Sequence, residues 1–216
     1  MNGETIELKT GAGRVYRCYV SRPKSAKAPG VVIGLDIFGF RQVFFDIADD
    51  FAARGYLAAV PDYFWDVQPN ESGTFRGQYK FPTMVETTGA TMAAVRTMAG
   101  CNGKVAVTGF CVGGNTAFIG AAQQGADAAA SYYGTRLHTL LDEVDAIKVP
   151  TVLHIAEHDE TYPDEERDRI LAAVKRNPNI SAHVYAAPHG FAHSHVDEAA
   201  GNLAHERTFQ IFDKLK

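Results

Sequence analysis

A glycine-rich turn surrounds one cysteine and has the pattern of a nucleophile site. Cys111 stands in the segment GFCVGG, with one glycine two residues before it and another two residues after it. Residues 104–108 predict a strand before this turn, and residues 112–124 predict a helix after it. The glycines permit the sharp strand-to-helix turn that exposes a nucleophile, and the helix N-terminus favours a thiolate there. The alternative interpretation is a buried structural cysteine.

An acid and then a histidine follow this cysteine in the chain, as an activated nucleophile requires. Asp159 comes after an expected strand at residues 150–155, and His189 comes after an expected strand at residues 181–185. His189 would exchange the proton of Cys111 and later activate water, while Asp159 would orient the imidazole. Three other acids lie near Asp159 in the sequence: Glu157, Glu160 and Asp164. The offset of Asp159 from the strand end favours it over these three.

The histidines also raise the alternative of a metal site. His154 and His158 have a helical ligand spacing, but His154 falls in an expected strand, where that spacing does not place both rings on one face. A second group is close in sequence: His189, His193, His195 and Asp197. Because the chain has neither a Cys-x-x-Cys nor a His-Glu-x-x-His motif, we expect no metal and no cofactor.

The elements that must position these residues alternate between strand and helix. Two short strands at residues 5–8 and 14–20 predict an N-terminal antiparallel hairpin. Further strands are expected at residues 31–35, 57–60, 104–108, 128–132, 150–155 and 181–185, and helices at 43–54, 82–99, 112–124, 164–176 and 196–215. This alternation predicts an α/β fold with a mainly parallel sheet and helices on both faces. The site then lies at the carboxyl ends of the strands.

Composition limits the classes of partner. The 216 residues, 46% of them hydrophobic and 21% charged, suit one domain that spans residues 1–216. The net charge of −4, without a basic block, argues against nucleic acid or an anionic membrane as partner. No signal peptide and no apolar run of about 18 residues is visible. We expect a small-molecule substrate and a monomer or weak homo-oligomer.

The other two cysteines, Cys18 and Cys101, stand in no motif. Cys18 falls in an expected strand and Cys101 in an expected helix-to-strand loop, so we interpret both as packing residues. Three cysteines are an odd number and too few for a disulfide framework, which favours a reducing, cytoplasmic compartment.

Several spaced segments together resemble the dienelactone hydrolase family, the carboxymethylenebutenolidase-like branch of the α/β-hydrolases. In chain order they are DIFG at 36–39, AAVPDY at 58–63, GFCVGG at 109–114, YYG at 132–134 and HGF at 189–191. The resemblance runs from about residue 15 to about residue 212. It implies a three-layer α/β-hydrolase fold and a cofactor-free hydrolase of small esters or lactones that acts through a thioester.

The resemblance also implies roles for individual residues. Cys111, Asp159 and His189 would form the triad, and the backbone N–H groups of Ile37 and Val112 would form the oxyanion hole. Asp36 takes the place of a glutamate that, in the family, contacts the catalytic thiol and helps to convert it to thiolate. Asp36 is shorter by one methylene and is a candidate for this activating role.

Substrate binding is where the sequence departs from the resemblance. Members that cleave dienelactone hold its carboxylate with arginines, one of them four residues after the catalytic histidine; here that position is His193. Arg76 lies near the expected place of another. The remaining candidates for lining the pocket are aromatic: Phe38, Tyr63, Trp65, Tyr133 and Phe191.

Two other functions remain open from the sequence. A class I glutaminase also has a Gly-x-Cys-x-Gly turn, but that family places a glutamate two residues after its histidine, where this chain has Phe191. A non-catalytic or redox-sensing protein that keeps the fold is the alternative of a different class, favoured by the short Asp36 and the missing arginine.

Overall fold

One sheet of eight strands organises the chain. The structure is a computed structural model and describes residues 3–193 and 197–216. The strand order is β1-β2-β4-β3-β5-β6-β7-β8. The bounds are β1 Glu4–Lys9, β2 Val15–Ser21, β3 Ala28–Gly34, β4 Leu57–Pro61, β5 Cys101–Phe110, β6 Ala128–Tyr132, β7 Thr151–His158 and β8 Ile180–Pro188. β1 pairs antiparallel with β2, and β2 pairs antiparallel with β4. All further neighbours in the sheet, from β4 through β3 to β8, pair parallel. The predicted hairpin and mainly parallel sheet are confirmed.

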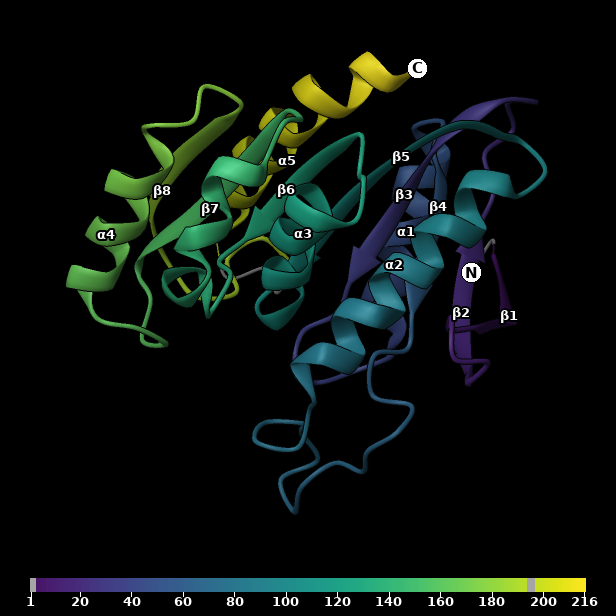
Figure 1. Cartoon of the computed structure of the whole chain (residues 1–216), viewed down its shortest axis with the longest axis horizontal. Coiled ribbons are helices and arrows are strands. Elements are labelled where there is room, and N and C mark those ends of the chain that lie inside the picture. Colours follow the sequence, from purple (N-terminus) through teal and green to yellow (C-terminus); the bar gives the residue numbers. More distant parts are fainter. Residues whose placement is uncertain (1–2, 194–196) are drawn as a thin grey trace.

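Helices cover both faces of this sheet (Figure 1). Their bounds are α1 Gln42–Ala53, α2 Phe81–Thr97, α3 Val112–Gln123, α4 Asp164–Val174 and α5 Glu198–Phe212. One apolar cluster joins the sheet to α1 and α5, and a second joins its other face to α2, α3 and α4. No helix in the described part of the chain is long and apolar enough to cross a membrane.

The central strand β3 shows why both faces are covered. All seven of its residues are buried. Val31 and Ile33 belong to the first apolar cluster, and Val32 between them belongs to the second. Successive side chains of a strand point to opposite faces, so a continuous apolar run needs helices on both sides.

Several element boundaries differ from those expected. β5 begins at Cys101, so this cysteine lies in a strand rather than in a loop, and β3 begins at Ala28. Cys101 and Ala28 pair across the sheet, and this pair extends both strands. A register shift separates it from the pairing that begins at Gly30. β7 extends to His158, which pairs with Pro188 of β8. The start expected for the last helix, residue 196, lies outside the described residues.

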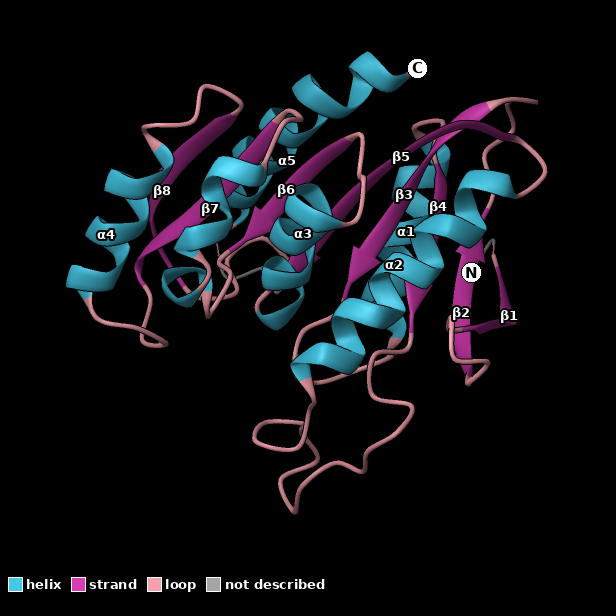
Figure 2. Ribbon diagram, in the orientation of Figure 1, coloured by secondary structure: helices cyan, strands magenta, loops and turns pink. Residues whose placement is uncertain are grey.

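A long connection, residues 62–80, leaves the sheet between β4 and α2 and lies at the carboxyl ends of the strands (Figure 2). Phe75 ties it to the loop after β3, because its N–H donates to Ile37 O at 2.8 Å. The Phe75 ring stacks on Phe64 with centroids 4.2 Å apart. Gly39, at φ +84, leaves room for the Phe75 ring, since a Cβ on residue 39 would lie 2.6 Å from that ring.

Candidate active site

Cys111 occupies a strained turn between β5 and α3. Its φ of 57° and ψ of −120° lie in a region that non-glycine residues rarely adopt. The Cys111 N–H donates to Tyr132 O at 3.0 Å, which fixes the turn against β6. A Cβ on Gly113 would lie 2.5 Å from the backbone carbon of Gly34, and one on Gly109 would lie 2.1 Å from Gly113 O. Both glycines are therefore needed for the turn to pack against β3 and α3.

His189 and Asp159 meet at the carboxyl ends of β8 and β7. His189 Nδ1 lies 2.8 Å from Asp159 Oδ2, and the Asp159 side chain is only 2% exposed. The other carboxylate oxygen accepts from the N–H of Thr161 at 2.9 Å and from its hydroxyl at 2.6 Å. A carboxylate held in this way fixes the imidazole with its Nδ1–H toward Asp159 and leaves Nε2 for a second partner.

Electrostatics connect His189 with Cys111. Burial lowers the pKa of His189, but its interactions with Asp159 and Cys111 outweigh burial and raise the pKa to about 10. Burial raises the pKa of Asp159, yet the hydrogen bonds from His189 and Thr161 bring it below its ordinary value. The surroundings of His189 therefore favour its imidazolium form.

Ile37 lines the same cavity as the cysteine, and Val112 directly follows the cysteine in the chain. The cavity measures about 260 Å³, and Ile37 and Cys111 both line it. Ile37 lies in the loop after β3, and Val112 is the first residue of α3. The Val112 N–H lies in the first turn of α3, where backbone N–H groups have no acceptor within the helix. An oxyanion hole made by the N–H groups of Ile37 and Val112 stays a prediction.

Asp36 directs its carboxylate to three groups other than the thiol. Its Oδ1 accepts from the Phe38 N–H at 2.9 Å, and its Oδ2 accepts from Arg41 Nη2 at 2.5 Å and lies 3.2 Å from His193 Nε2. Burial raises the pKa of Asp36, but contact with His193 and the charge of Arg41 bring it below its ordinary value. None of these described contacts is with Cys111, so none of them supports the predicted role of Asp36 in activating the thiol.

The comparisons with known proteins now decide the family. The model of the dienelactone hydrolase family matches residues 16–216. This chain belongs to the dienelactone hydrolase family. Among its relatives is a putative carboxymethylenebutenolidase of Azospirillum brasilense, 35% identical over 96% of each chain. Carboxymethylenebutenolidase 1 of Cupriavidus pinatubonensis is 29% identical over 100% of this chain and 99% of the relative.

Solved structures confirm the α/β-hydrolase fold expected from the sequence. A putative dienelactone hydrolase from Klebsiella pneumoniae aligns over 98% of both chains, with a TM-score of 0.77 and 22% identity. A dienelactone hydrolase-like promiscuous phosphotriesterase, P91, from metagenomic libraries aligns over 100% of this chain and 99% of its own, with a TM-score of 0.80 and 20% identity. At these identities the likeness shows the fold alone.

Two charged residues that the sequence analysis missed line the cavity beside those it named. Arg41 and Glu160 join Arg76 and His193 around Cys111. In the sequence, Glu160 stands out only as an alternative to Asp159. Arg41 stands in no motif, and its only signal was its position just before α1, five residues after Asp36.

The aromatic candidates separate into three places. Phe38 lines the cavity and is 55% exposed. Tyr63 lies in the core, 1% exposed, where its hydroxyl bonds to the hydroxyls of Thr88 at 2.7 Å and Thr116 at 2.9 Å. It does not line the cavity, because burial between β4, α2 and α3 uses both its ring and its hydroxyl. Trp65 lines a different groove.

Tyr133 lies against His189 and Phe191 packs on Tyr133, and neither ring lines the cavity. Both are 1% exposed. The Tyr133 ring contacts His189 edge-on at 4.9 Å between centroids and Phe191 at 5.3 Å. Burial, with the charges of Cys111 and Asp36, raises the pKa of Tyr133 well above its ordinary value. The Tyr133 ring therefore packs directly against the imidazole.

A buried chain of hydrogen bonds anchors α5 to the segment after His189. His205 Nε2 lies 3.0 Å from Ala192 O, and its Nδ1 lies 3.1 Å from the Tyr132 hydroxyl. The Tyr132 hydroxyl contacts Thr208 Oγ1 at 2.6 Å, which in turn lies 2.9 Å from His154 Nε2. Tyr132, whose carbonyl accepts from the Cys111 N–H, therefore also helps to hold the segment after His189 through His205.

One direction of donation satisfies every group in this chain. Burial lowers the pKa of both His154 and His205, so each ring is neutral and has a single N–H. His154 Nδ1 accepts from the Tyr185 hydroxyl at 2.8 Å, and Arg207 donates to that hydroxyl at 3.0 Å. The donors in order are Tyr185, His154, Thr208, Tyr132 and His205, and the last acceptor is Ala192 O. Neither His154 nor His205 stands in a motif, so no local pattern in the sequence indicates this chain of hydrogen bonds.

Proposed function

We propose that this protein hydrolyses small carboxylic esters or lactones through Cys111, His189 and Asp159. The observation that carries the proposal is the 2.8 Å contact of His189 Nδ1 with Asp159 Oδ2, on a histidine whose pKa is raised to about 10 by Asp159 and Cys111. Membership of the dienelactone hydrolase family and relatives named carboxymethylenebutenolidase support the same reaction class.

The proposed reaction has two stages. The Cys111 thiolate attacks the acyl carbon, and the oxygen that becomes negative accepts hydrogen bonds from the N–H groups of Ile37 and Val112. Each such donor contributes about 3 kcal/mol to stabilising the transition state. Collapse breaks the ester bond, and His189 gives its proton to the leaving alkoxide, which leaves a thioester. In a lactone the alcohol stays attached to the acyl group.

Hydrolysis of the thioester uses the same groups in reverse. His189 takes a proton from water, and the hydroxide attacks the thioester carbon. Collapse releases the acid and restores the thiolate. Asp159 keeps the imidazole in the tautomer that both stages need and stabilises the imidazolium.

Replacement of the nucleophile tests this proposal. We expect Cys111→Ala to lose turnover of 4-nitrophenyl acetate by about three orders of magnitude or more, because the covalent step is removed. Cys111→Ser should also be strongly impaired, since a serine hydroxyl does not form an anion beside His189 as a thiol does. Cys101→Ala, on a half-buried thiol at the start of β5, is the matched control and should keep wild-type rates.

The possible outcomes separate the alternatives. Wild-type turnover in the Cys111→Ala variant would overturn the assignment of the nucleophile. A wild-type protein whose Cys111 reacts with iodoacetamide but which hydrolyses no ester or lactone would identify the non-catalytic, redox-sensing alternative.

A further inference from the structure

The loop after β3 contains a tight turn, residues 36–39, whose peptide groups are held from several sides. The turn carries Ile37 at the reaction cavity. The Gly39 N–H donates to Asp36 O at 3.2 Å, which closes the turn and orients the peptide group shared by Asp36 and Ile37. In the next peptide group, Ile37 O accepts from the Phe75 N–H at 2.8 Å. Because a trans peptide points its N–H away from its C=O, the direction of the Ile37 N–H depends on how this turn is held.

The Asp36 side chain joins this turn to two neighbouring segments. Its Oδ1 accepts from the Phe38 N–H at 2.9 Å, the bond to the backbone two residues on that aspartates form in turns. Its Oδ2 accepts from Arg41 Nη2 at 2.5 Å and lies 3.2 Å from His193 Nε2. The side chain is only 3% exposed, so little water competes for these contacts. The carboxylate therefore ties the turn to the start of α1 and to the segment after His189.

We propose that Asp36 is a positioning residue, whose carboxylate holds the turn so that the Ile37 N–H points at the substrate oxygen that becomes negative. The inference rests on the proposed hydrolase function, in which Ile37 is an oxyanion donor. Donors that are aimed before the reaction stabilise the developing charge most, and a small displacement removes much of the effect. Asp36 then acts on the transition state through Ile37, and not on the thiol of Cys111.

The length of the side chain separates this role from activation of the thiol. Aspartate bonds the backbone N–H two residues on, and the additional methylene of a glutamate disturbs that geometry. Asp36→Glu should therefore lower ester turnover, because the turn loses its bond to the Phe38 N–H. An activating carboxylate would instead reach the thiol better with the longer side chain. A rise in turnover in this variant would overturn the proposal.

Asp36→Ala separates the two roles in a second way. Alkylation of Cys111 by iodoacetamide needs a thiolate but no oxyanion hole. We expect this variant to be alkylated at least as fast as the wild type, because Arg41 loses its counterion and its charge favours an anion in the cavity. In contrast, kcat for 4-nitrophenyl acetate should fall by about tenfold or more, with a smaller change in KM. A parallel fall of alkylation and kcat, or an unchanged kcat, would overturn the proposal.

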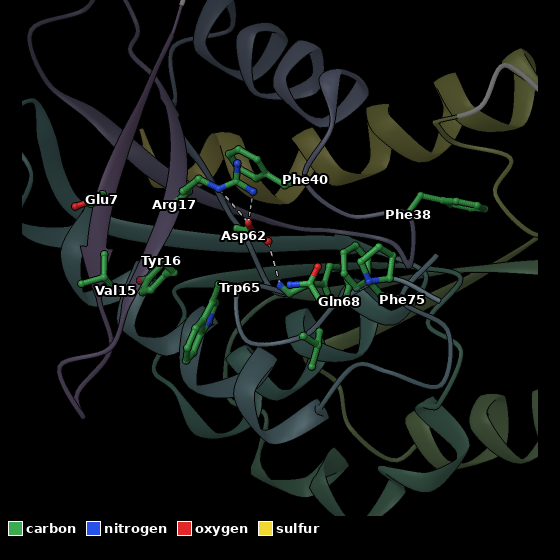
Figure 3. A pocket seen from close by; sticks show the side chains of 13 residues that line it. Glu7, Val15, Tyr16, Arg17, Phe38, Phe40, Asp62, Trp65, Gln68 and Phe75 are labelled. Atoms are coloured by element: carbon green, nitrogen blue, oxygen red, sulfur yellow. Dashed lines mark hydrogen bonds and ion pairs between the residues drawn. The ribbon is translucent and has the colours of Figure 1, made fainter. Parts of the chain in front are cut away.

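Asp62, directly after β4, provides a matched control. Its Oδ1 accepts from the Phe64 N–H at 3.1 Å, and its Oδ2 accepts from Arg17 Nη2 at 2.7 Å. Figure 3 shows this carboxylate with dashed lines to Arg17. Asp62 is not among the described residues that line the reaction cavity. Asp62→Ala should lower the urea midpoint about as much as Asp36→Ala but keep kcat within about twofold of wild type. Equal losses of kcat in the two variants would overturn the proposal.

A reversible ketone inhibitor tests the position of Ile37 without turnover. The Cys111 thiolate adds to the carbonyl carbon of 2,2,2-trifluoroacetophenone, and the electron pair of the C=O bond moves to the oxygen, which then needs the Ile37 N–H. This adduct protects the thiol from iodoacetamide.

We expect the half-protecting concentration of the ketone to rise about tenfold in Asp36→Ala and to stay at the wild-type value in Asp62→Ala. The same concentration for Asp36→Ala and the wild type would overturn the role of Asp36. A wild-type protein that the ketone protects but that hydrolyses no ester would refute the hydrolase function, and the protection assay would still decide the role of Asp36.

Discussion

At the scale of single residues, the charge state of His189 governs the site. Its side chain is 16% exposed and lies between a buried carboxylate and a cysteine. Burial alone lowers the pKa of a histidine. The raised pKa of about 10 therefore reflects the interactions with Asp159 and Cys111, which favour the imidazolium. Below that pH the ring is protonated, and as the pH rises through it the positive charge beside Cys111 is lost.

Alkylation of Cys111 by iodoacetamide tests this ion pair. We expect the wild-type rate to change little between about pH 6 and about pH 9, because the charge of the neighbouring imidazolium does not change in this range. Asp159→Asn keeps the shape but removes the charge that holds the imidazolium. Its alkylation rate should rise steadily with pH, and its ester turnover should fall by about two orders of magnitude or more. The same flat profile in both proteins would contradict a role for Asp159 in holding the imidazolium.

At the scale of elements, α5 is more than a cover for the sheet. Thr208, fully buried on this helix, bonds to Tyr132 on β6 and to His154 on β7. His205, one turn earlier, bonds to Ala192 O in the segment that follows His189. The helix therefore couples the ends of two strands to the loop of His189.

Removal of the Thr208 hydroxyl tests this coupling. Thr208→Val keeps the volume but removes one hydrogen-bond partner from the Tyr132 hydroxyl and the partner of His154 Nε2. We expect the free energy of unfolding in urea to fall by about 1–3 kcal/mol, the cost of unpaired buried polar groups. Thr97→Val is the matched control, because Thr97 is exposed on α2 and its hydroxyl bonds only to its own helix. Its effect should stay within about 0.5 kcal/mol, and equal losses in the two variants would argue against the buried chain.

At the scale of the whole molecule, the two apolar clusters share one sheet. Neighbouring residues of β3 such as Val31 and Val32 belong to opposite clusters. Both helical layers pack on the same strands. Loss of either layer would therefore expose one face of the sheet on which the other layer packs. We infer that the chain folds as one unit, including the N-terminal hairpin, where Cys18 on β2 is fully buried.

Coincident unfolding transitions would bear this out. In a Cys101→Ala, Cys111→Ala background, Cys18 is the remaining thiol, and its reaction with a thiol reagent reports opening of the hairpin. We expect its midpoint in urea to coincide with those of Trp65 emission and far-UV circular dichroism. A lower midpoint for Cys18 would show that the hairpin unfolds independently.

Local pattern was enough to predict much of this protein. The spacing of apolar residues predicted the strands and helices, because the periodicity of burial depends on residues that are close in the sequence. The turn at Cys111 was predictable for the same reason, since its geometry depends on glycines within two residues. Asp159 and His189 could be named because parallel strands bring their carboxyl ends to one edge of the sheet.

Contacts between distant elements were decided by the tertiary structure alone. The sequence suggested that Asp36 acts on the thiol, but folding places Arg41 and His193 beside it, and these take its carboxylate. Tyr63, a pocket candidate by type, is drawn into the core by hydroxyl partners on two helices. The bond from His205 to Ala192 carries no local signal. Which side chains meet across such distances depends on how whole elements pack, and that is settled only when both faces of the sheet are covered.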